Sequence, residues 1–163
     1  MEQKESMTSD LTIWLDMEPY LRQWFIHEQG GEVPVRLKKG SPDSNIIYTF
    51  LQVPPKGEPK DVERDGTVAI VIPCYKYKNI KYCNYLSPHA REMLHYEIRN
   101  RFLVELWEDL HKFGNIGKQK MELIYAWMES HGIEATETNY FAVQKIYQRL
   151  RDNQRLKNWR EKS

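Results

Sequence analysis

The spacing of apolar residues along the chain predicts a mostly helical protein with one buried strand. Residues 67–72 (TVAIVI) are continuously apolar and rich in β-branched side chains, which is typical of a strand covered on both faces. In five other segments, apolar residues recur every three or four positions, which is the helical period. The predicted helices span residues 11–28, 42–53, 88–113, 118–131 and 139–155, and the last reaches at least Arg155.

Serine, proline and glycine mark the ends of several predicted helices. Residues 41–42 and 87–88 are both Ser-Pro, which places serine at an N-cap and proline at the first helical position. Gly114 and Gly132 are the expected ends of the helices that precede them. Pro19 lies inside the first predicted helix, so we expect a kink or a break there.

Two segments between the helices have other patterns. Residues 32–37 alternate apolar and other residues, and Pro34 lacks an amide hydrogen, so we predict a short strand at a sheet edge. Residues 54–66 contain three prolines and two glycines, which predicts an exposed, mobile loop. No series of alternating strands and helices is visible, so a large parallel sheet is not expected.

These elements predict an α+β fold that is mostly helical, with a small β-sheet around residues 67–72. We expect residues 1–114 to form an α+β domain. We expect residues 115–163 to form a C-terminal helical hairpin, similar to a helix-turn-helix, that packs on the first part.

The composition of the 163 residues is that of a folded protein without a membrane span. Hydrophobic residues make up 40% and aromatic residues 12%, which argues against intrinsic disorder. No apolar run approaches the roughly 20 residues that cross a bilayer. Residues 1–10 are polar and unlike a secretory signal, and Cys74 and Cys83 do not make a disulfide framework. We therefore expect a soluble, cytoplasmic protein.

The net charge of +1, from 24 basic and 23 acidic residues, hides a segmental pattern. Residues 66–101 hold 6 basic and 2 acidic residues, a net charge of +4. Residues 140–163 hold 7 basic and 2 acidic residues, a net charge of +5. Such asymmetry predicts local basic surfaces, unless opposite blocks neutralise each other within the fold.

The basic last helix is the strongest candidate for a nucleic-acid contact. In a helix-turn-helix the second helix enters the major groove, where Arg, Lys and Gln meet phosphates and base edges. The connection from Gly132 to Thr138 has seven residues, however, which is longer than the usual turn. A helical hairpin with a solvated basic face remains the alternative. The candidate DNA contacts are Gln144, Lys145, Gln148, Arg149, Arg151, Arg155, Lys157 and Arg160.

A second candidate is the segment of residues 74–85 (CYKYKNIKYCNY), in which tyrosine alternates with lysine. In an extended chain Tyr75 and Tyr77 share one face, and Lys76 and Lys78 share the other. Such rings stack on bases while lysines meet phosphates. Tyrosine is also an ordinary strand residue, so a purely structural role remains open.

Metal binding and catalysis find little support in the sequence. Cys74, Cys83, His89 and His95 lack the close ligand pairs of structural zinc sites. No phosphate-binding loop, nucleophile elbow or zinc-protease motif occurs. Glu105 and Asp109 form a possible carboxylate pair on one helix, although such a run is usually solvated. We expect no cofactor, no metal and no enzymatic activity.

Residues 115–151 (NIGKQKMELIYAWMESHGIEATETNYFAVQKIYQRLR) resemble the C-terminal part of small proteins of largely unknown function from Bacteroides-type bacteria. Those proteins are often encoded near mobile or phage-like elements. The stretches YLRQWFIHEQGG, VAIVIP and LWEDLHKFGNIG fit the same pattern. The resemblance implies a DNA-associated accessory role and no catalytic residues.

The leading functional hypothesis is therefore a non-enzymatic, nucleic-acid-binding accessory or regulatory protein. Its partner would be DNA rather than RNA, bound mainly through the basic C-terminal helix. The alternative is a protein-interaction or assembly module that forms a homo-oligomer or docks on a larger partner. An aromatic residue such as Trp159 in a polar tail would be an anchor for that partner.

Overall fold

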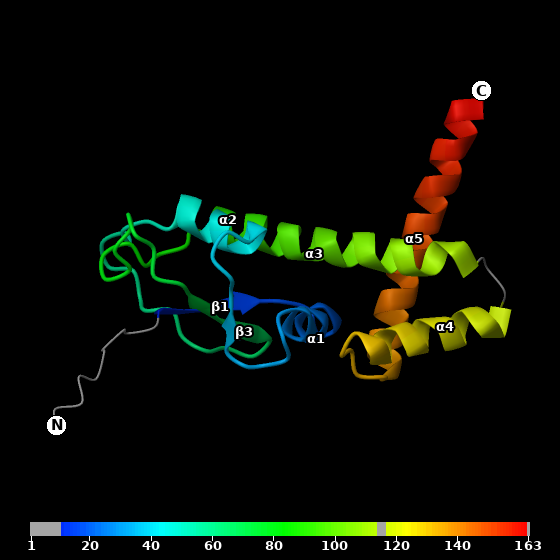
Figure 1. The fold of residues 1–163 in the computed structure, drawn as a ribbon, viewed down its shortest axis with the longest axis horizontal. Coiled ribbons are helices and arrows are strands. Elements are labelled where there is room, and N and C mark those ends of the chain that lie inside the picture. The colour runs from blue at the N-terminus through cyan, green and yellow to red at the C-terminus, as the bar shows by residue number, and fades with distance from the viewer. Residues whose placement is uncertain (1–10, 114–116, 163) are drawn as a thin grey trace. The chain divides into compact units, whose positions relative to one another are not determined.

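The computed structural model describes residues 11–113 and 117–162, and it confirms a mostly helical α+β fold with a small sheet (Figure 1). Its strands are β1 (Leu11–Asp16), β2 (Val35–Arg36) and β3 (Thr67–Ile72). Its helices are α1 (Pro19–Glu28), α2 (Pro42–Phe50), α3 (Pro88–Leu110), the short 3-10 helix η1 (His111–Phe113), α4 (Gly117–Ser130) and α5 (Glu137–Lys162).

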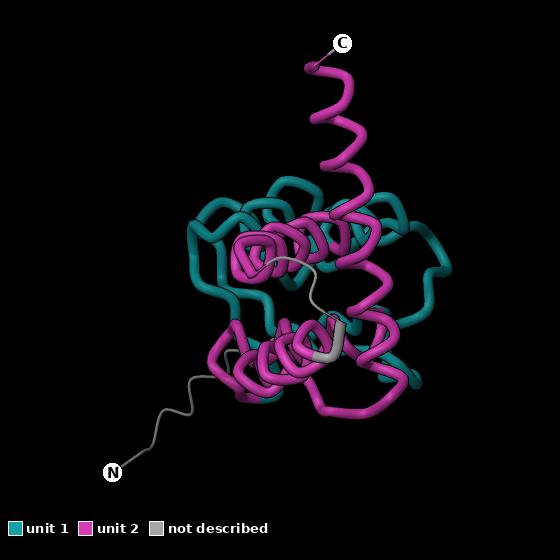
Figure 2. The backbone as a smooth tube through the Cα atoms, turned by 90° about the vertical axis from the view of Figure 1, so that its right-hand side faces the viewer, with its two compact units in different colours: residues 1–16, 33–94 teal, residues 17–32, 95–163 magenta. Residues whose placement is uncertain are grey.

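The chain packs as two compact units, which Figure 2 draws in different colours. Unit 1 contains β1 and residues 33–94, so the sheet, α2 and the first turns of α3 belong to it. Unit 2 contains residues 17–32 and 95–163, which bring together α1, the rest of α3, α4 and α5. The expected division into an α+β domain and a C-terminal hairpin at residue 114 stays a prediction.

β3 is the central strand of the sheet, as its continuous apolar sequence predicts. β1 pairs with it antiparallel, with Ile13 opposite Ile70, and β2 pairs with it parallel along the other edge. Residues 68–72 are all buried, because the strand has a neighbour on each side and packing on both faces. The predicted edge strand is confirmed as β2, which begins immediately after Pro34.

Residues 11–16 form a strand, so the prediction that a helix runs from residue 11 to residue 28 is wrong for its first part. The apolar positions of LTIWLD fit the helical period, but they also fit alternation. Ile13 and Leu15 are buried, while Trp14 between them is partly exposed. Pairing with β3 places all six residues in register with Thr67–Ile72, and the outward-facing amide and carbonyl of Trp14 bond to Asp61 and Arg91 instead. The expected break at Pro19 is confirmed, because β1 ends at Asp16 and Pro19 begins α1.

Residues 74–85 do not form the extended strand that their Tyr/Lys alternation indicated. The segment contains bends and a turn, and in it the amides of Tyr82 and Cys83 both donate to the carbonyl of Asn79. An isolated bridge pairs Tyr85 with Gln52. Pro73 directly after β3 removes an amide donor and ends the strand there, so the residues that follow leave the sheet.

Serine caps begin α2 and α3, as the sequence predicts. The Ser41 hydroxyl accepts a hydrogen bond from the amide of Ser44 at 3.2 Å, and the Ser87 hydroxyl accepts one from the amide of Ala90 at 3.2 Å. α4 also follows its prediction, and so does α5, which was expected to reach at least Arg155 and ends at Lys162. Gly114, the expected end of the long helix, lies outside the described residues. No helix within residues 11–113 and 117–162 is both long and apolar enough to cross a membrane.

The core of unit 2 is built around the buried ring of Phe102 on α3. The rings of Tyr20 and Trp24 on α1 lie 5.3 and 5.5 Å from it, and the ring of Trp127 on α4 lies 5.6 Å from it. The Trp24 and Trp127 contacts are edge-to-face, a favourable aromatic geometry. These contacts hold α1, α3 and α4 around one point, and α5 packs against α1 and α4.

Candidate nucleic-acid interface

α5 changes from a core helix into a surface helix along its length. Its buried stripe, formed by Asn139, Val143, Ile146 and Tyr147, ends near Leu150. The positions that continue this stripe are Gln154 and Lys157, because successive residues turn by about 100° around the axis. Polar residues at these positions remove the apolar contact, and the last turns of α5 run past the other helices of unit 2 (Figure 2).

Most of the predicted DNA contacts on α5 lie away from its buried stripe. Gln144, Lys145, Gln148, Arg149 and Arg155 lie on the opposite side of the helix, and Arg151 and Arg160 lie at its borders. Lys157 differs, since it lies in line with the stripe two heptads after Val143. We name the cations Lys145, Arg149, Arg151, Arg155 and Arg160 the basic side of α5. All of them are exposed except Arg151, which is half-buried.

Lys120 on α4 joins the basic side of α5, which the sequence did not indicate. Its ammonium donates to the Gln148 side-chain oxygen at 2.9 Å and lies 5.7 Å from the centre of the Tyr147 ring. The Arg151 guanidinium lies 6.0 Å from the same ring, and its Nη1 is buried without a hydrogen-bond partner. Two cations therefore share one aromatic ring at the α4–α5 contact.

The electrostatics of Lys120 reflect this crowding of positive charge. Burial lowers the pKa of the Lys120 ammonium, and the charge of Arg151 lowers it further. Asp152 acts in the opposite direction, and Arg155 adds to the lowering. An anion bound here would relieve the repulsion among these cations, which is the condition that favours a phosphate.

Gln148 is engaged within unit 2. Besides accepting from Lys120, its amide nitrogen donates to Asp152 at 3.1 Å. A base contact by Gln148 would have to replace these two bonds. Lys145 and Arg149, by contrast, are exposed, and they lie one helical turn apart.

The Tyr/Lys segment lies in unit 1, and only some of its residues bond to the rest of the unit. The Tyr75 hydroxyl donates to the Ser44 carbonyl at 2.8 Å, and Lys78 donates to the carbonyls of Tyr48, Thr49 and Leu51 at the end of α2. Lys78 thereby satisfies carbonyls that the helix leaves unpaired.

The neighbours of Tyr75 and Lys78 in the sequence face solvent. Tyr77 is 79% exposed, and Lys76 lies 5.3 Å from the centre of its ring. The predicted common face of Tyr75 and Tyr77 is therefore wrong, because one ring is half-buried and the other is exposed. Tyr77 and Lys76 remain available as a small stacking and phosphate-contacting pair.

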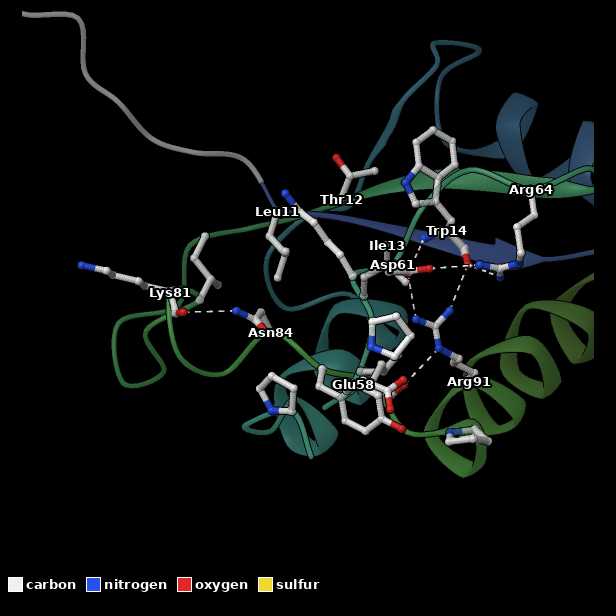
Figure 3. Close-up of a pocket in the computed structure, with 17 residues that line it drawn as sticks. Leu11, Thr12, Ile13, Trp14, Glu58, Asp61, Arg64, Lys81, Asn84 and Arg91 are labelled. Carbon is white, nitrogen blue, oxygen red and sulfur yellow. Dashed lines mark hydrogen bonds and ion pairs between the residues drawn. The ribbon is translucent and has the colours of Figure 1, made fainter. Parts of the chain in front are cut away.

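A cavity of about 780 Å³ in unit 1 lies between β1, the loop of residues 54–66 and the start of α3 (Figure 3). The Arg91 guanidinium donates to Asp61 at 2.8 Å, to the Trp14 carbonyl at 2.9 Å and to the Leu86 carbonyl at 3.0 Å. Arg64 donates to the other Asp61 oxygen at 3.2 Å. The charges of Asp61, Arg64 and Arg91 in this cavity are thus paired with one another. The same bonds connect the loop and α3 to β1.

Asp61 titrates differently in this arrangement than in water. Burial raises the pKa of its carboxyl group, but hydrogen bonds from Arg91, the Trp14 amide and Arg64, together with the charge of Arg91, outweigh burial. The net effect lowers the pKa of Asp61 below its ordinary range. The exposed loop of residues 54–66 is therefore tied down at one point near its centre.

Comparison of the chain with protein-family models, with curated proteins and with solved structures found no match in any of the three.

The arrangement around Asp61 predicts a stability effect that depends on pH. Because the pKa is lower in the folded state, Asp61 contributes stability above the ordinary aspartate pKa of about 3.9, and this contribution disappears as the pH falls through the folded-state pKa. Asp61→Asn should lower the free energy of unfolding by roughly 1–3 kcal/mol at pH 7, with a much smaller difference near pH 2. Urea unfolding of both proteins across this range measures the effect.

Asp65→Asn is the matched control, since it removes an exposed carboxylate from the same loop. It should leave the free energy of unfolding nearly unchanged at both pH values. A cost of Asp61→Asn that is equally large at pH 7 and pH 2 would show that its charge contributes nothing.

Proposed function

We propose that the protein is a non-enzymatic, cytoplasmic, nucleic-acid-binding accessory or regulatory protein whose basic side of α5 contacts DNA. The observation that carries the proposal is the accumulation of cations on the outer side of α5, where Lys145, Arg149, Arg155 and Arg160 are exposed. Between Lys145 and Lys162 the helix carries seven basic and two acidic residues, a net charge of 7 − 2 = +5. Phosphates are the natural partner of such a surface.

The proposed contact is mainly electrostatic. Arg and Lys that meet phosphates position a protein on the duplex and displace condensed counterions, whereas base edges are read in the grooves. Lys120 and Arg151 would add a phosphate site beside the helix, where their charges repel each other in the free protein. DNA is the favoured partner because a helix with an exposed basic side fits the wide major groove of DNA better than the deep, narrow groove of RNA.

The connection between α4 and α5 limits the similarity to a helix-turn-helix. Six residues separate Ser130 from Glu137. The side-chain oxygen of Gln23 on α1 accepts from the amide of Glu134 in this connection at 2.8 Å, and from the side chain of Asn139 in the first turn of α5 at 3.2 Å. The proposal therefore assigns phosphate contacts to α5 and does not assign base recognition to a standard two-helix motif.

Charge reversal on α5 should weaken DNA binding without unfolding the protein. In Arg149→Glu/Arg155→Glu, two cations of the basic side become acidic, so we expect affinity for a 20-base-pair duplex to fall on the order of tenfold or more, about 1.4 kcal/mol per factor of ten. Fluorescence anisotropy with a labelled duplex measures the affinity, and circular dichroism checks the fold.

Lys56→Glu/Lys60→Glu is the matched control, because it makes the same change of net charge on the exposed loop of unit 1. Its affinity should stay within about threefold of that of the wild type, since only the long-range charge has changed. Equal losses in both double variants would mean that α5 is not the contact surface.

Assembly is the second candidate function, and two exposed apolar residues favour it. Leu156 and Trp159 are 55% and 69% exposed and lie three residues apart, so they share one side of the last turns of α5.

Self-association through Leu156 and Trp159 predicts a dimeric mass in light scattering at micromolar concentration. Leu156→Ala/Trp159→Ala should then return the mass to that of one chain, 19.6 kDa. A wild-type mass of 19.6 kDa would exclude assembly through this surface.

A further inference from the structure

A second polar cluster in unit 2 lies at the contact between the end of α3 and the turn after α4. Glu105 and Asp109 are one helical turn apart on α3, and His131 directly follows α4. The Nε2 atom of His131 lies 2.7 Å from a Glu105 oxygen and 3.6 Å from an Asp109 oxygen. One donor atom from each of the three residues lies within 4.8 Å of the other two. The three side chains thus converge on one point.

Hydrogen bonds fix which nitrogen of His131 faces the carboxylates. Its Nδ1 lies 2.7 Å from the Trp127 carbonyl oxygen, which can only accept, so Nδ1 carries the hydrogen. The lone pair of Nε2 in the neutral ring is then directed at the carboxylate oxygens of Glu105 and Asp109. A cation must lie between these acceptors, and both a proton on Nε2 and a metal ion meet that need.

Trp127 also orients the other parts of the cluster. Its indole nitrogen donates to the Asp109 oxygen at 2.9 Å, and its ring stacks on the His131 ring at 4.2 Å between centres. This combination, a histidine that donates its second nitrogen to a carbonyl and a carboxylate held by its own hydrogen bond, is the usual support around metal ligands.

The turn that carries His131 is fixed as well. Gly132 has a φ of +75°, and a Cβ atom there would lie 2.6 Å from the Cβ atom of His27. Only glycine fits this close approach to α1. His131 therefore enters the cluster from a turn that lies close against α1.

We propose that Glu105, Asp109 and His131 bind a divalent transition-metal ion. One imidazole and two carboxylates form a mixed nitrogen and oxygen donor set, which suits Zn²⁺ or Mn²⁺ better than Mg²⁺ or Ca²⁺. Zinc bonds of roughly 2.0–2.2 Å place neighbouring ligand atoms about 3.4 Å apart in a tetrahedron. The observed 2.7 and 3.6 Å bracket this value, so small side-chain movements complete the site.

Charge at the cluster favours a bound cation. Two carboxylates lie beside one imidazole here, so the three donors together carry negative charge when the imidazole is neutral. Glu105 and Asp109 keep 38% and 46% of their side-chain surface exposed, which leaves an entry path and room for water as a further ligand. The ion would fasten α3 to the α4–α5 turn, and so it would stabilise unit 2.

Zinc titration of the full chain, freed of metal by EDTA, tests the proposal. Calorimetry with ZnCl₂ should give one ion per chain, and a 100-fold excess over Kd should raise Tm by roughly 5–10 °C. Glu105→Gln/Asp109→Asn should weaken zinc affinity at least 100-fold. Co²⁺ provides a second readout, because visible absorption bands of the bound ion report its ligand geometry.

Two controls make the result specific. Glu108→Gln/Glu122→Gln removes the same number of carboxylates from exposed positions on α3 and α4 and should keep full affinity. Cys74→Ser/Cys83→Ser should also keep it, because these thiols are not ligands in the proposed site. A wild type without stoichiometric binding would overturn the proposal and leave an imidazolium ion pair between His131 and Glu105. Undiminished binding by Glu105→Gln/Asp109→Asn would overturn it as well.

Discussion

The packing of Trp127 is the interaction on which most of unit 2 depends. Its ring packs edge-to-face with Phe102, the centre of the aromatic core, and stacks on the ring of His131. Its indole nitrogen and its carbonyl oxygen hold Asp109 and His131. A single buried residue therefore links the apolar core to a polar cluster at the surface. Because α5 packs against α4, the same residue helps to position the helix that carries the basic side.

α5 shows how one helix serves the core and the surface in succession. Up to Leu150 the apolar stripe of α5 is buried in unit 2, and the opposite side of the helix faces solvent and carries basic residues. Beyond Leu150 the stripe positions are polar, so packing no longer stabilises the helix and almost every residue is exposed. An isolated segment of this length is a marginal helix in water. A bound polyanion would stabilise it, which connects the fold of α5 to the proposed function.

The sequence predicted helices well where an apolar stripe and a cap agreed, as in α2 and α3. It failed for residues 11–16, because LTIWLD satisfies both periods and only the free edge of β3 decides between them. The prediction that Tyr75 and Tyr77 share one face of a strand was wrong, because the strand ends before Pro73 and these residues are not extended.

The missed site residues share one property, which is that tertiary packing brings them together. Lys120 reaches the basic side of α5 from another helix, and it precedes Arg151 by 31 residues. Glu105 and Asp109 were visible as a pair, but nothing near them in the sequence indicates His131, which follows 22 residues after Asp109. Only the packing of α4 on the Phe102 core brings these groups within reach of each other.

The most direct measurement of the central claim is the salt dependence of DNA binding by the wild-type protein. If the cations of α5 displace counterions from phosphates, the logarithm of the association constant falls linearly with the logarithm of the salt concentration, by about 0.9 per phosphate neutralised. Four or five exposed or half-buried cations on the basic side predict a slope of roughly −4 on random duplex DNA. No binding at low salt, or a slope near zero, would contradict nucleic-acid binding through α5.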